Sequence, residues 1–284
     1  MSKIAIVTDS TGDIPVKLAE ELNINVIPLN VHFHEEVFKD GVDINHNSFF
    51  EKLKVSPVPP RTSQPSPGDF HKVYKALLAE GAETIISIHI SKELSGTYQS
   101  ATIARDMLPE AKIHIIDSKS ASMGLGMIAI NAAKAVLEGK EVQEIVAMAE
   151  EMVDNHKVMF AVDTLEYLHR NGRIGGAAKL IGGLLNVKPM LEVDSDGKVA
   201  PLGKIRGKAK VVPFLLEQTQ TFLEGYQGEV DLSVIHAQEP VLAQEILAQF
   251  KGQFAVRNGY LAELGSVIGT HVGPGTIGII VQKL

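Results

Sequence analysis

The chain has 284 residues, of which 45% are hydrophobic, so it is long enough for two domains and can fill a substantial core. It contains no cysteine, which excludes disulfides, thiolate metal sites and a thiol nucleophile. A net charge of -7, no tryptophan and only 5% aromatic residues argue against a nucleic-acid-binding surface, which needs basic patches and stacking rings. The first residues run directly into a strand-like segment, without a signal peptide or membrane-spanning stretch, so we expect a cytoplasmic protein.

The first half of the sequence alternates between strand-like and helix-like segments, which predicts a mainly parallel sheet covered by helices. In chain order we expect a strand over Ile4–Asp9, a helix beginning at Pro15, a strand over Ile24–Phe33, a helix over Pro67–Ala79, a strand over Thr84–Ile90, a helix over Ser95–Leu108, a strand over Lys112–Ser118 and a helix over Ser122–Leu137. The proline-rich stretch before Pro67, with Pro57, Pro59, Pro60 and Pro65, predicts an exposed loop.

The pattern changes after a long helical stretch over Val142–His156. The remaining elements that we expect are a hairpin within Lys188–Arg206, helices over Lys210–Leu223 and Val241–Phe250, and strands over Val230–His236 and Gly278–Lys283. The sequence therefore predicts an α/β protein of two domains. Residues 1–156 form an α/β/α domain with a parallel sheet, and residues 157–284 form an α+β domain with a mixed or antiparallel sheet that closes against the first.

Three stretches rich in hydroxyl groups and glycine offer donors that can hold an oxyanion: Arg61–Ser66, Ser95–Ser100 and Gly269–Gly275. Ser95 follows a predicted strand and opens a predicted helix, so it should lie at the carboxyl end of the strand, where open α/β sheets bind ligands. The alternative is that Ser95 only caps the helix, although a helix amino terminus also attracts anions. His271 lies in a segment too glycine-rich to be simple core filling.

Other apparent motifs have structural explanations. Gly124–Ala129 matches the dinucleotide fingerprint in letters, but it begins well after a strand ends and no strand-borne acid follows at the expected spacing, so we interpret its glycines as helix packing. Gly273–Gly278 leads into a strand and predicts a turn. Asp194–Gly197 matches the start of a calcium loop, but Ile205 occupies the position that needs a glutamate, which favours a plain hairpin turn.

Along its whole length the chain resembles the DegV family of bacterial fatty-acid-binding proteins. The motifs that carry the resemblance are Val7-Thr8-Asp9-Ser10-Thr11, Thr62-Ser63-Gln64-Pro65-Ser66, Leu94-Ser95-Gly96-Thr97-Tyr98-Gln99-Ser100-Ala101, Leu165-Glu166-Tyr167-Leu168 with Asn171-Gly172-Arg173-Ile174, and Gly269-Thr270-His271-Val272-Gly273-Pro274-Gly275. The resemblance implies two α/β domains with one long-chain fatty acid buried between them. It also implies a partner, the ATP-dependent catalytic subunit of fatty acid kinase, which converts the presented carboxylate to an acyl phosphate.

The resemblance also implies roles for individual residues. Thr62 and Ser95 match the family positions whose hydroxyls bind the carboxylate, and His271 matches the histidine of the same hydrogen-bond network. The second domain would then contribute both His271 and part of the wall of the acyl-chain tunnel. Arg173 matches a family arginine near the site, although the neighbouring Arg170 remains an alternative. We add Ser122 and Gly96 as supporting positions, and we expect neither a metal nor a cofactor apart from the fatty acid.

Two other functions remain open at this point. One is a self-contained hydrolase or transferase with Ser95 as nucleophile and His271 as its base, although the sequence lacks the Gly-x-Ser-x-Gly elbow. The other is a protein that binds a sugar or nucleotide phosphate, which would need a polar cavity.

The densest basic stretch is Lys204–Lys210, and its cations Lys204, Arg206 and Lys208 form a candidate partner surface. They would dock an acidic face of the kinase subunit or an anionic membrane during lipid exchange. The alternative is a solvated corner between a strand and a helix, because runs of charge are usually only exposed.

Overall fold

The structure, a computed structural model, describes residues 3–181 and 187–284. The first part of the chain forms a four-stranded parallel sheet in the order β2-β1-β6-β7. Its strands are β1 (Ile4–Asp9), β2 (Ile24–Ile27), β6 (Thr84–His89) and β7 (Lys112–Asp117). Every residue of β6 is buried, because this strand lies inside the sheet and both of its faces are covered. The predicted parallel sheet is confirmed.

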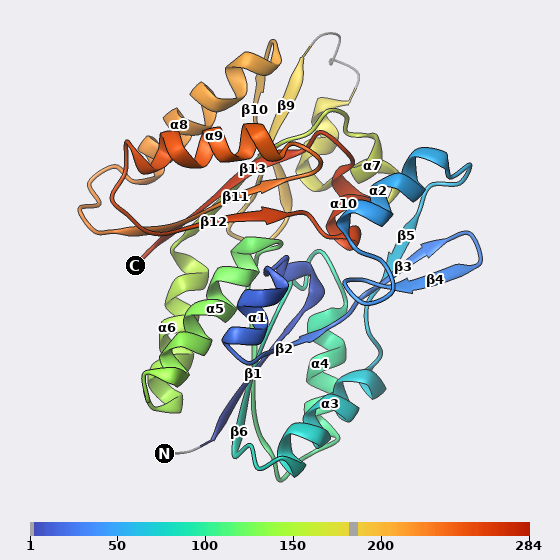
Figure 1. The fold of residues 1–284 in the computed structure, drawn as a ribbon, viewed down its shortest axis with the longest axis vertical. Coiled ribbons are helices and arrows are strands. Elements are labelled where there is room, and N and C mark those ends of the chain that lie inside the picture. Colours follow the sequence, from blue (N-terminus) through green and yellow to red (C-terminus); the bar gives the residue numbers. More distant parts are fainter. Residues whose placement is uncertain (1–2, 182–186) are drawn as a thin grey trace.

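Helices cover both faces of this sheet (Figure 1). They are α1 (Val16–Glu21), α3 (Pro67–Ala79), α4 (Thr97–Asp106), α5 (Met123–Leu137) and α6 (Val142–Asp154). Successive side chains of a strand point to opposite faces. Ile85 accordingly packs in one cluster with Phe70 and Tyr74 of α3, whereas Ile86 packs in another that includes α1, α5 and α6.

A six-stranded mixed sheet follows, in the order β10-β9-β8-β13-β11-β12. Its strands are β8 (His156–Ala161), β9 (Lys188–Val193), β10 (Val199–Ile205), β11 (Val230–His236), β12 (Val256–Glu263) and β13 (Ile277–Lys283). Neighbouring strands are antiparallel except β11 and β12, which are parallel. Helices α8 (Val211–Phe222) and α9 (Pro240–Lys251) pack on one face. The mixed sheet and the β9–β10 hairpin confirm two predictions.

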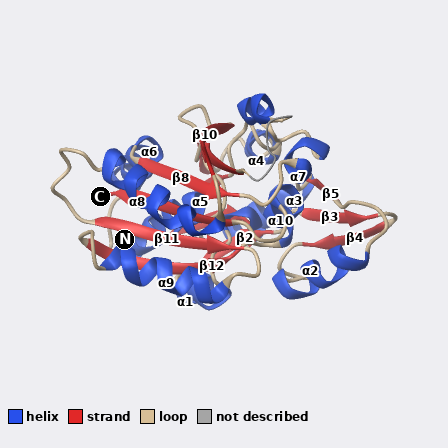
Figure 2. Ribbon diagram, turned by 90° about the horizontal axis from the view of Figure 1, so that it is seen from above, coloured by secondary structure: helices blue, strands red, loops and turns tan. Residues whose placement is uncertain are grey.

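A small antiparallel sheet lies to one side, where its β3–β4 hairpin projects from the molecule (Figures 1 and 2). Its strands are β3 (Asn30–Phe33), β4 (Glu36–Lys39) and β5 (Arg61–Ser63). Near it are the helices α2 (His46–Val55), α7 (Glu166–Arg170) and α10 (Ser266–Val272). Elsewhere, the described chain forms short 3-10 turns at Ser10–Gly12, Gly175–Leu180 and Lys208–Lys210. Because α10 contacts α2, α7 and β3, this region fixes the helix that carries His271.

Helix α5 lies between the two large sheets and contacts strands of both. Twelve of its fifteen residues are buried. A Cβ atom at Gly126 would lie 2.4 Å from the carbonyl oxygen of Gly12, and one at Gly124 would lie 2.0 Å from Ser120 Oγ. The prediction that these glycines serve helix packing is confirmed.

The core is continuous across the two large sheets. One cluster contains Ile6 and Ile86 of the first sheet, residues of α5, and Phe160 and Ile280 of the second sheet. The division of the chain at residue 156 stays a prediction.

Three sequence predictions were wrong. The strand expected over Ile24–Phe33 is two strands in different sheets, because Pro28 has no N–H for the ladder and the pairing with β1 ends at Ile27. The helix expected to reach His156 ends at Asp154, and His156 begins β8. The proline-rich stretch is not simply an exposed loop: Pro60 and Pro65 are buried and flank β5.

Candidate functional site

A narrow pocket lies between the loops that follow β6 and β7, the second sheet, and α10. Side chains such as Leu94, Ala121, Phe160, Ile235 and Val267 give it mainly aliphatic walls. Its volume is about 80 Å³. A sugar or nucleotide phosphate would need a polar pocket, whereas the walls of this pocket are mainly apolar. Apolar walls suit a hydrocarbon chain.

Five polar residues predicted from the sequence line this one pocket: Thr62, Ser95, Arg173 and His271, described first, and Ser122, described below. The first four come from β5, the loop before α4, the segment after α7, and α10. His271 Nε2 lies 2.9 Å from Thr62 Oγ1, although the two residues are 209 positions apart. The fold therefore gathers hydroxyl, imidazole and guanidinium groups at one place.

The His271 side chain is neutral. Burial, and to a lesser degree the nearby Arg173 guanidinium, lowers the pKa of the imidazole to about 4. Its Nδ1 atom is buried and makes no hydrogen bond to any residue that the structure describes. A buried polar atom without a partner is costly, and such atoms occur where a ligand or water completes the site.

Hydrogen bonds to two backbone carbonyl oxygens hold the Arg173 side chain in place. Its Nε donates to Leu94 O at 3.2 Å, and its Nη1 donates to Asn171 O at 2.8 Å. Arg170, the alternative in the sequence, instead pairs with Glu166 on the exposed surface of α7 and is absent from the pocket lining among the described residues. The geometry favours Arg173 as the cation of the site.

Ser95 and Gly96 lie at the start of α4. The Ser95 hydroxyl contacts Thr97 Oγ1 at 2.9 Å, and Gly96 is the cap residue but supplies no side-chain hydrogen bond. A Cβ atom at Gly96 would lie 2.7 Å from Gln64 Nε2, so this glycine lets Gln64 approach the pocket. Gly96 is not itself a lining residue.

Ser122 does line the pocket. Its backbone has φ of 53° and ψ of -146°, a region that non-glycine residues rarely adopt and that costs about 1 to 3 kcal/mol. The Ser122 hydroxyl donates to Asp13 Oδ2, which ties this strained position to the loop after β1.

Two aspartates that sequence reasoning missed position α10. Asp13 Oδ1 accepts from the Gly265 N–H at 2.9 Å, and Asp40 Oδ1 accepts from the Ser266 N–H at 3.0 Å. Such N–H groups have no partner within their own helix. Burial is the main cause that raises the pKa of both carboxyl groups above the ordinary value for an aspartate. Their partners are 252 and 226 residues away, so no local signal could reveal them.

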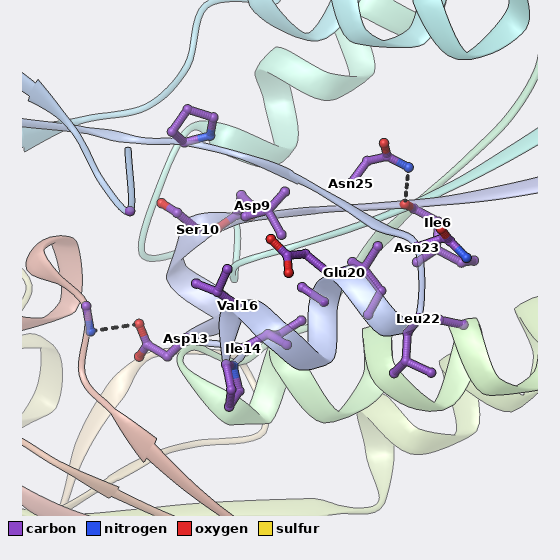
Figure 3. A pocket seen from close by; sticks show the side chains of 18 of the residues that line it. Ile6, Asp9, Ser10, Asp13, Ile14, Val16, Glu20, Leu22, Asn23 and Asn25 are labelled. Carbon is purple, nitrogen blue, oxygen red and sulfur yellow. Dashed lines mark hydrogen bonds between the residues drawn. The ribbon is translucent and has the colours of Figure 1, made fainter. Parts of the chain in front are cut away.

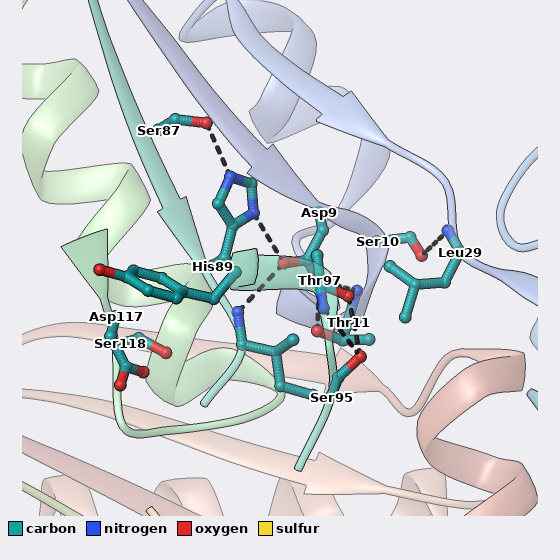
Figure 4. A network of polar contacts seen from close by, with 12 residues as sticks. Asp9, Ser10, Thr11, Leu29, Ser87, His89, Ser95, Thr97, Asp117 and Ser118 are labelled. Carbon is teal, nitrogen blue, oxygen red and sulfur yellow. Dashed lines mark hydrogen bonds and ion pairs between the residues drawn. The ribbon is translucent and has the colours of Figure 1, made fainter. Parts of the chain in front are cut away.

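A buried polar network joins β1 to β6 at the point where the strand order reverses (Figure 4). His89 Nδ1 lies 3.0 Å from Asp9 Oδ2, and His89 Nε2 lies 2.7 Å from Ser87 Oγ. These three side chains have the composition of a catalytic triad, but all are buried at 1% exposure or less, and each is held by hydrogen bonds within the network. The network therefore fixes the strand ends that carry the pocket loops. Its sequence signals are Asp9, within the motif Val7-Thr8-Asp9-Ser10-Thr11, and the polar pair Ser87 and His89 within an apolar run.

The predicted hydrolase pair does not form in the described structure. Ser95 makes its hydrogen bonds to Thr97, and His271 makes its hydrogen bond to Thr62. Over residues 3–181 and 187–284 there is also no cluster of three metal-ligating side chains and no helix long and apolar enough to span a bilayer.

The candidate partner surface lies outside the pocket. Lys204, Arg206 and Lys208 are exposed around the end of β10, and Lys208 pairs with Glu239. Neither Lys204 nor Arg206 forms an ion pair with a described residue.

The fold and the site together define a class of α/β protein in which two sheets with their helices enclose a mainly apolar pocket. Hydrogen-bond donors that suit an oxyanion line one wall of this pocket. The model of the DegV family, described as "Uncharacterised protein, DegV family", matches residues 3–284, and the chain belongs to this family. A DegV domain-containing protein from Caldanaerobacter subterraneus subsp. tengcongensis is 36% identical over 284 residues and is covered completely, as is this chain.

Two solved structures are similar over nearly the whole chain. One, described as "Fatty Acid Binding of a DegV family Protein from Thermus thermophilus", has a TM-score of 0.94 at 35% identity and covers 99% of this chain and 100% of its own. The other, described as "DegV, a fatty acid binding protein from Bacillus subtilis", has a TM-score of 0.89 at 33% identity and covers 100% of both chains. The predicted family and fold class are confirmed.

Proposed function

We propose that this chain binds one long-chain fatty acid in the pocket and presents its carboxylate to a separate ATP-dependent kinase subunit. The observation that carries the proposal is the combination, in one pocket, of aliphatic walls with Thr62, Ser95, Arg173 and His271. The similar proteins from Thermus thermophilus and Bacillus subtilis, both described as fatty acid binding, support it.

The polar groups suit a carboxylate. Taking an ion out of water is expensive unless several donors meet it, and hydrogen bonds to a charged group are the strong kind. The tautomer of neutral His271 decides which group donates to the ligand. With the proton on Nε2, the imidazole donates to Thr62 Oγ1 and leaves the Thr62 hydroxyl to donate to the carboxylate. With the proton on Nδ1, Thr62 donates to Nε2 and the unpartnered Nδ1 supplies the donor. Arg173 uses two of its five N–H donors on carbonyls and supplies positive charge close by.

The aliphatic walls account for affinity. At about 0.8 kcal/mol per buried methylene, about 14 methylenes contribute on the order of 11 kcal/mol before ordering costs. A volume of about 80 Å³ lies well below the roughly 300 to 1,000 Å³ of ordinary ligand pockets, so the acyl chain has to move the apolar side chains apart as it enters. After these costs we expect submicromolar binding.

Two features support presentation of the carboxylate to a partner: the sequence lacks a phosphate-binding loop for ATP, and it has an exposed basic surface. The sequence has no Gly-x-x-x-x-Gly-Lys-Ser/Thr stretch for holding ATP phosphates. Lys204, Arg206 and Lys208 form an exposed basic surface on an acidic chain. We propose that this surface docks an acidic face of the kinase subunit, with electrostatics mainly raising the association rate.

We expect the purified protein to carry one long-chain fatty acid per chain. Organic extraction and mass spectrometry of freshly purified protein, with thermal melting after added fatty acid, measure this directly. Recovery of an acyl chain and a higher melting temperature are the expected results. No acyl chain and no thermal shift would refute fatty acid binding, and a bound nucleotide would favour a phosphate ligand instead.

Reversing the charge of the basic surface should weaken docking to the kinase subunit without weakening fatty acid binding. In Arg206→Glu with Lys208→Glu, we expect a higher concentration for half-maximal kinase activity and a weaker salt dependence, while the fatty acid stays bound. The matched control is Lys75→Glu with Lys251→Glu, two exposed lysines elsewhere with the same change in charge. Identical activity curves for the two double variants at low ionic strength would remove the docking role, and loss of binding to anionic vesicles alone would assign the surface to membranes.

A further inference from the structure

A second, larger cavity lies beside α1, and Ile14, Val16 and Glu20 are among the residues that line it (Figure 3). This groove has a volume of about 1130 Å³ and is bounded by α1, β2, the last turns of α5 and the end of β12. Both strands are the outermost of their sheets. Helix α1 has six residues and buries only Ala19, so it is too short to cover this face of the first sheet.

Exposed apolar side chains gather in the groove. Of the thirteen large apolar residues that are exposed in the described parts of the chain, five line it, with exposed fractions from 36 to 69%: Val16, Val26, Val42, Leu137 and Leu261. Scattered exposed apolar residues are ordinary, but a contiguous set marks an interaction site. Because these side chains stay open to solvent around a wide groove, a macromolecular segment covers them better than an enclosed small molecule does.

The rim of the groove is acidic. Glu20, Glu80 and Glu263 are exposed and form no ion pair with any residue in 3–181 or 187–284. The single lysine of the lining, Lys3, donates to the Glu80 backbone carbonyl. Unpaired negative charge repels anionic lipids and nucleic acids and attracts a basic partner.

We propose that this groove docks a basic amphipathic helix of a partner protein. Two of its walls are helices, α1 and α5, whose side-chain ridges accept another helix. The groove, at about 1130 Å³, is far larger than the pocket of about 80 Å³ and leaves room for the side chains on one face of a helix. Its apolar stripe covers the valines and leucines, and its lysines or arginines meet Glu20 and Glu263.

The groove is separate from the fatty-acid pocket and from the basic partner surface. No residue lines both cavities, and the contacts of Asp13 with Ser122 and Gly265 lie between them. Docking in the groove therefore does not depend on what the other pocket binds.

The probe is a fluorescein-labelled synthetic peptide of leucine and lysine in which the leucines recur at helical spacing. Fluorescence anisotropy at low ionic strength measures its binding to the intact chain. We expect Glu20→Lys with Glu263→Lys to weaken binding about tenfold or more, since each reversed charge removes an attraction and adds a repulsion. Glu35→Lys with Glu110→Lys, two exposed and unpaired glutamates of the described chain outside the groove, makes the same change in net charge and should have little effect.

A second pair tests the apolar part of the groove. Val16→Ala with Leu137→Ala should weaken peptide binding, whereas Val55→Ala with Val241→Ala, equally exposed elsewhere, should not. The proposal is overturned if wild type does not bind the peptide, if both glutamate pairs lose affinity equally, or if a peptide with glutamate in place of lysine binds as well. Sedimentation showing a dimer that Glu20→Lys with Glu263→Lys dissociates would instead assign the groove to a second copy of the chain.

Discussion

Thr62→Ala and Ser95→Ala are each expected to weaken fatty acid binding by about 1 to 3 kcal/mol, the usual range for losing a hydrogen bond to a charged group. Both hydroxyls line the same pocket, so their effects should not add. His271→Ala should reduce acyl-phosphate formation more than lipid retention, because the imidazole contacts Thr62 rather than the hydrocarbon walls. Isothermal calorimetry on delipidated protein and kinase turnover with the same variants measure the two effects.

Thr221→Ala is the matched control for the hydroxyl variants. This threonine lies on the exposed surface of α8 and donates to Glu217 O, far in sequence from the pocket motifs. It should bind fatty acid like wild type. Equal affinity and equal turnover for wild type and all three pocket variants would show that the carboxylate lies elsewhere.

Gly126→Ala is expected to destabilise the fold by about 1 to 3 kcal/mol, although alanine is the better helix former by about 1 kcal/mol. The added Cβ would lie 2.4 Å from the Gly12 carbonyl oxygen, so either α5 or the loop after β1 has to shift. Residues of α5 belong to the core cluster shared by the large sheets, and Ile14 of the loop after β1 packs against it. The midpoint of urea unfolding measures the change in stability.

Gly68→Ala separates packing from helix propensity. Gly68 lies in the first turn of α3, and a Cβ atom there would meet only Ser66 Oγ at 3.6 Å. This variant should be as stable as wild type or more stable by up to about 1 kcal/mol. If Gly126→Ala behaved in the same way, the close contact between α5 and Gly12 would not constrain the fold.

The sequence predicted those elements whose signals are local. The alternation of strands and helices gave β1, β6, β7 and α3, and the Asp-Gly turn gave the β9–β10 hairpin. Strand β12 was missed because its residues are mostly half exposed and its pattern lacks a regular apolar alternation. Periodicity describes one element at a time, whereas β12 is held by its pairing with β11.

The candidate site was predicted in two steps: the hydroxyl- and glycine-rich stretches indicated where donors gather, and the family resemblance then gave individual residues their roles. Family motifs indicated Thr62, Ser95 and His271, and the structure places them on one pocket. Neither motifs nor patterns indicated Asp13 and Asp40 as the anchors of α10, because those contacts join the two ends of the chain. The acidic groove was also missed, since it forms only where β2 and β12, edges of two different sheets, come together.

The position of β13 in the second sheet determines the order in which the two large sheets can form while the chain is being synthesised. This strand, Ile277–Lys283, lies inside the second sheet between β8 and β11. All strands of the first sheet lie before residue 118 and can pair while later residues are still being made. The second sheet cannot close until residues 277–283 have left the ribosome, and α10 with His271 is translated only shortly before them. Under the proposed function, a chain therefore acquires its fatty acid only after residues 277–283 have emerged, when the apolar walls of the pocket first meet.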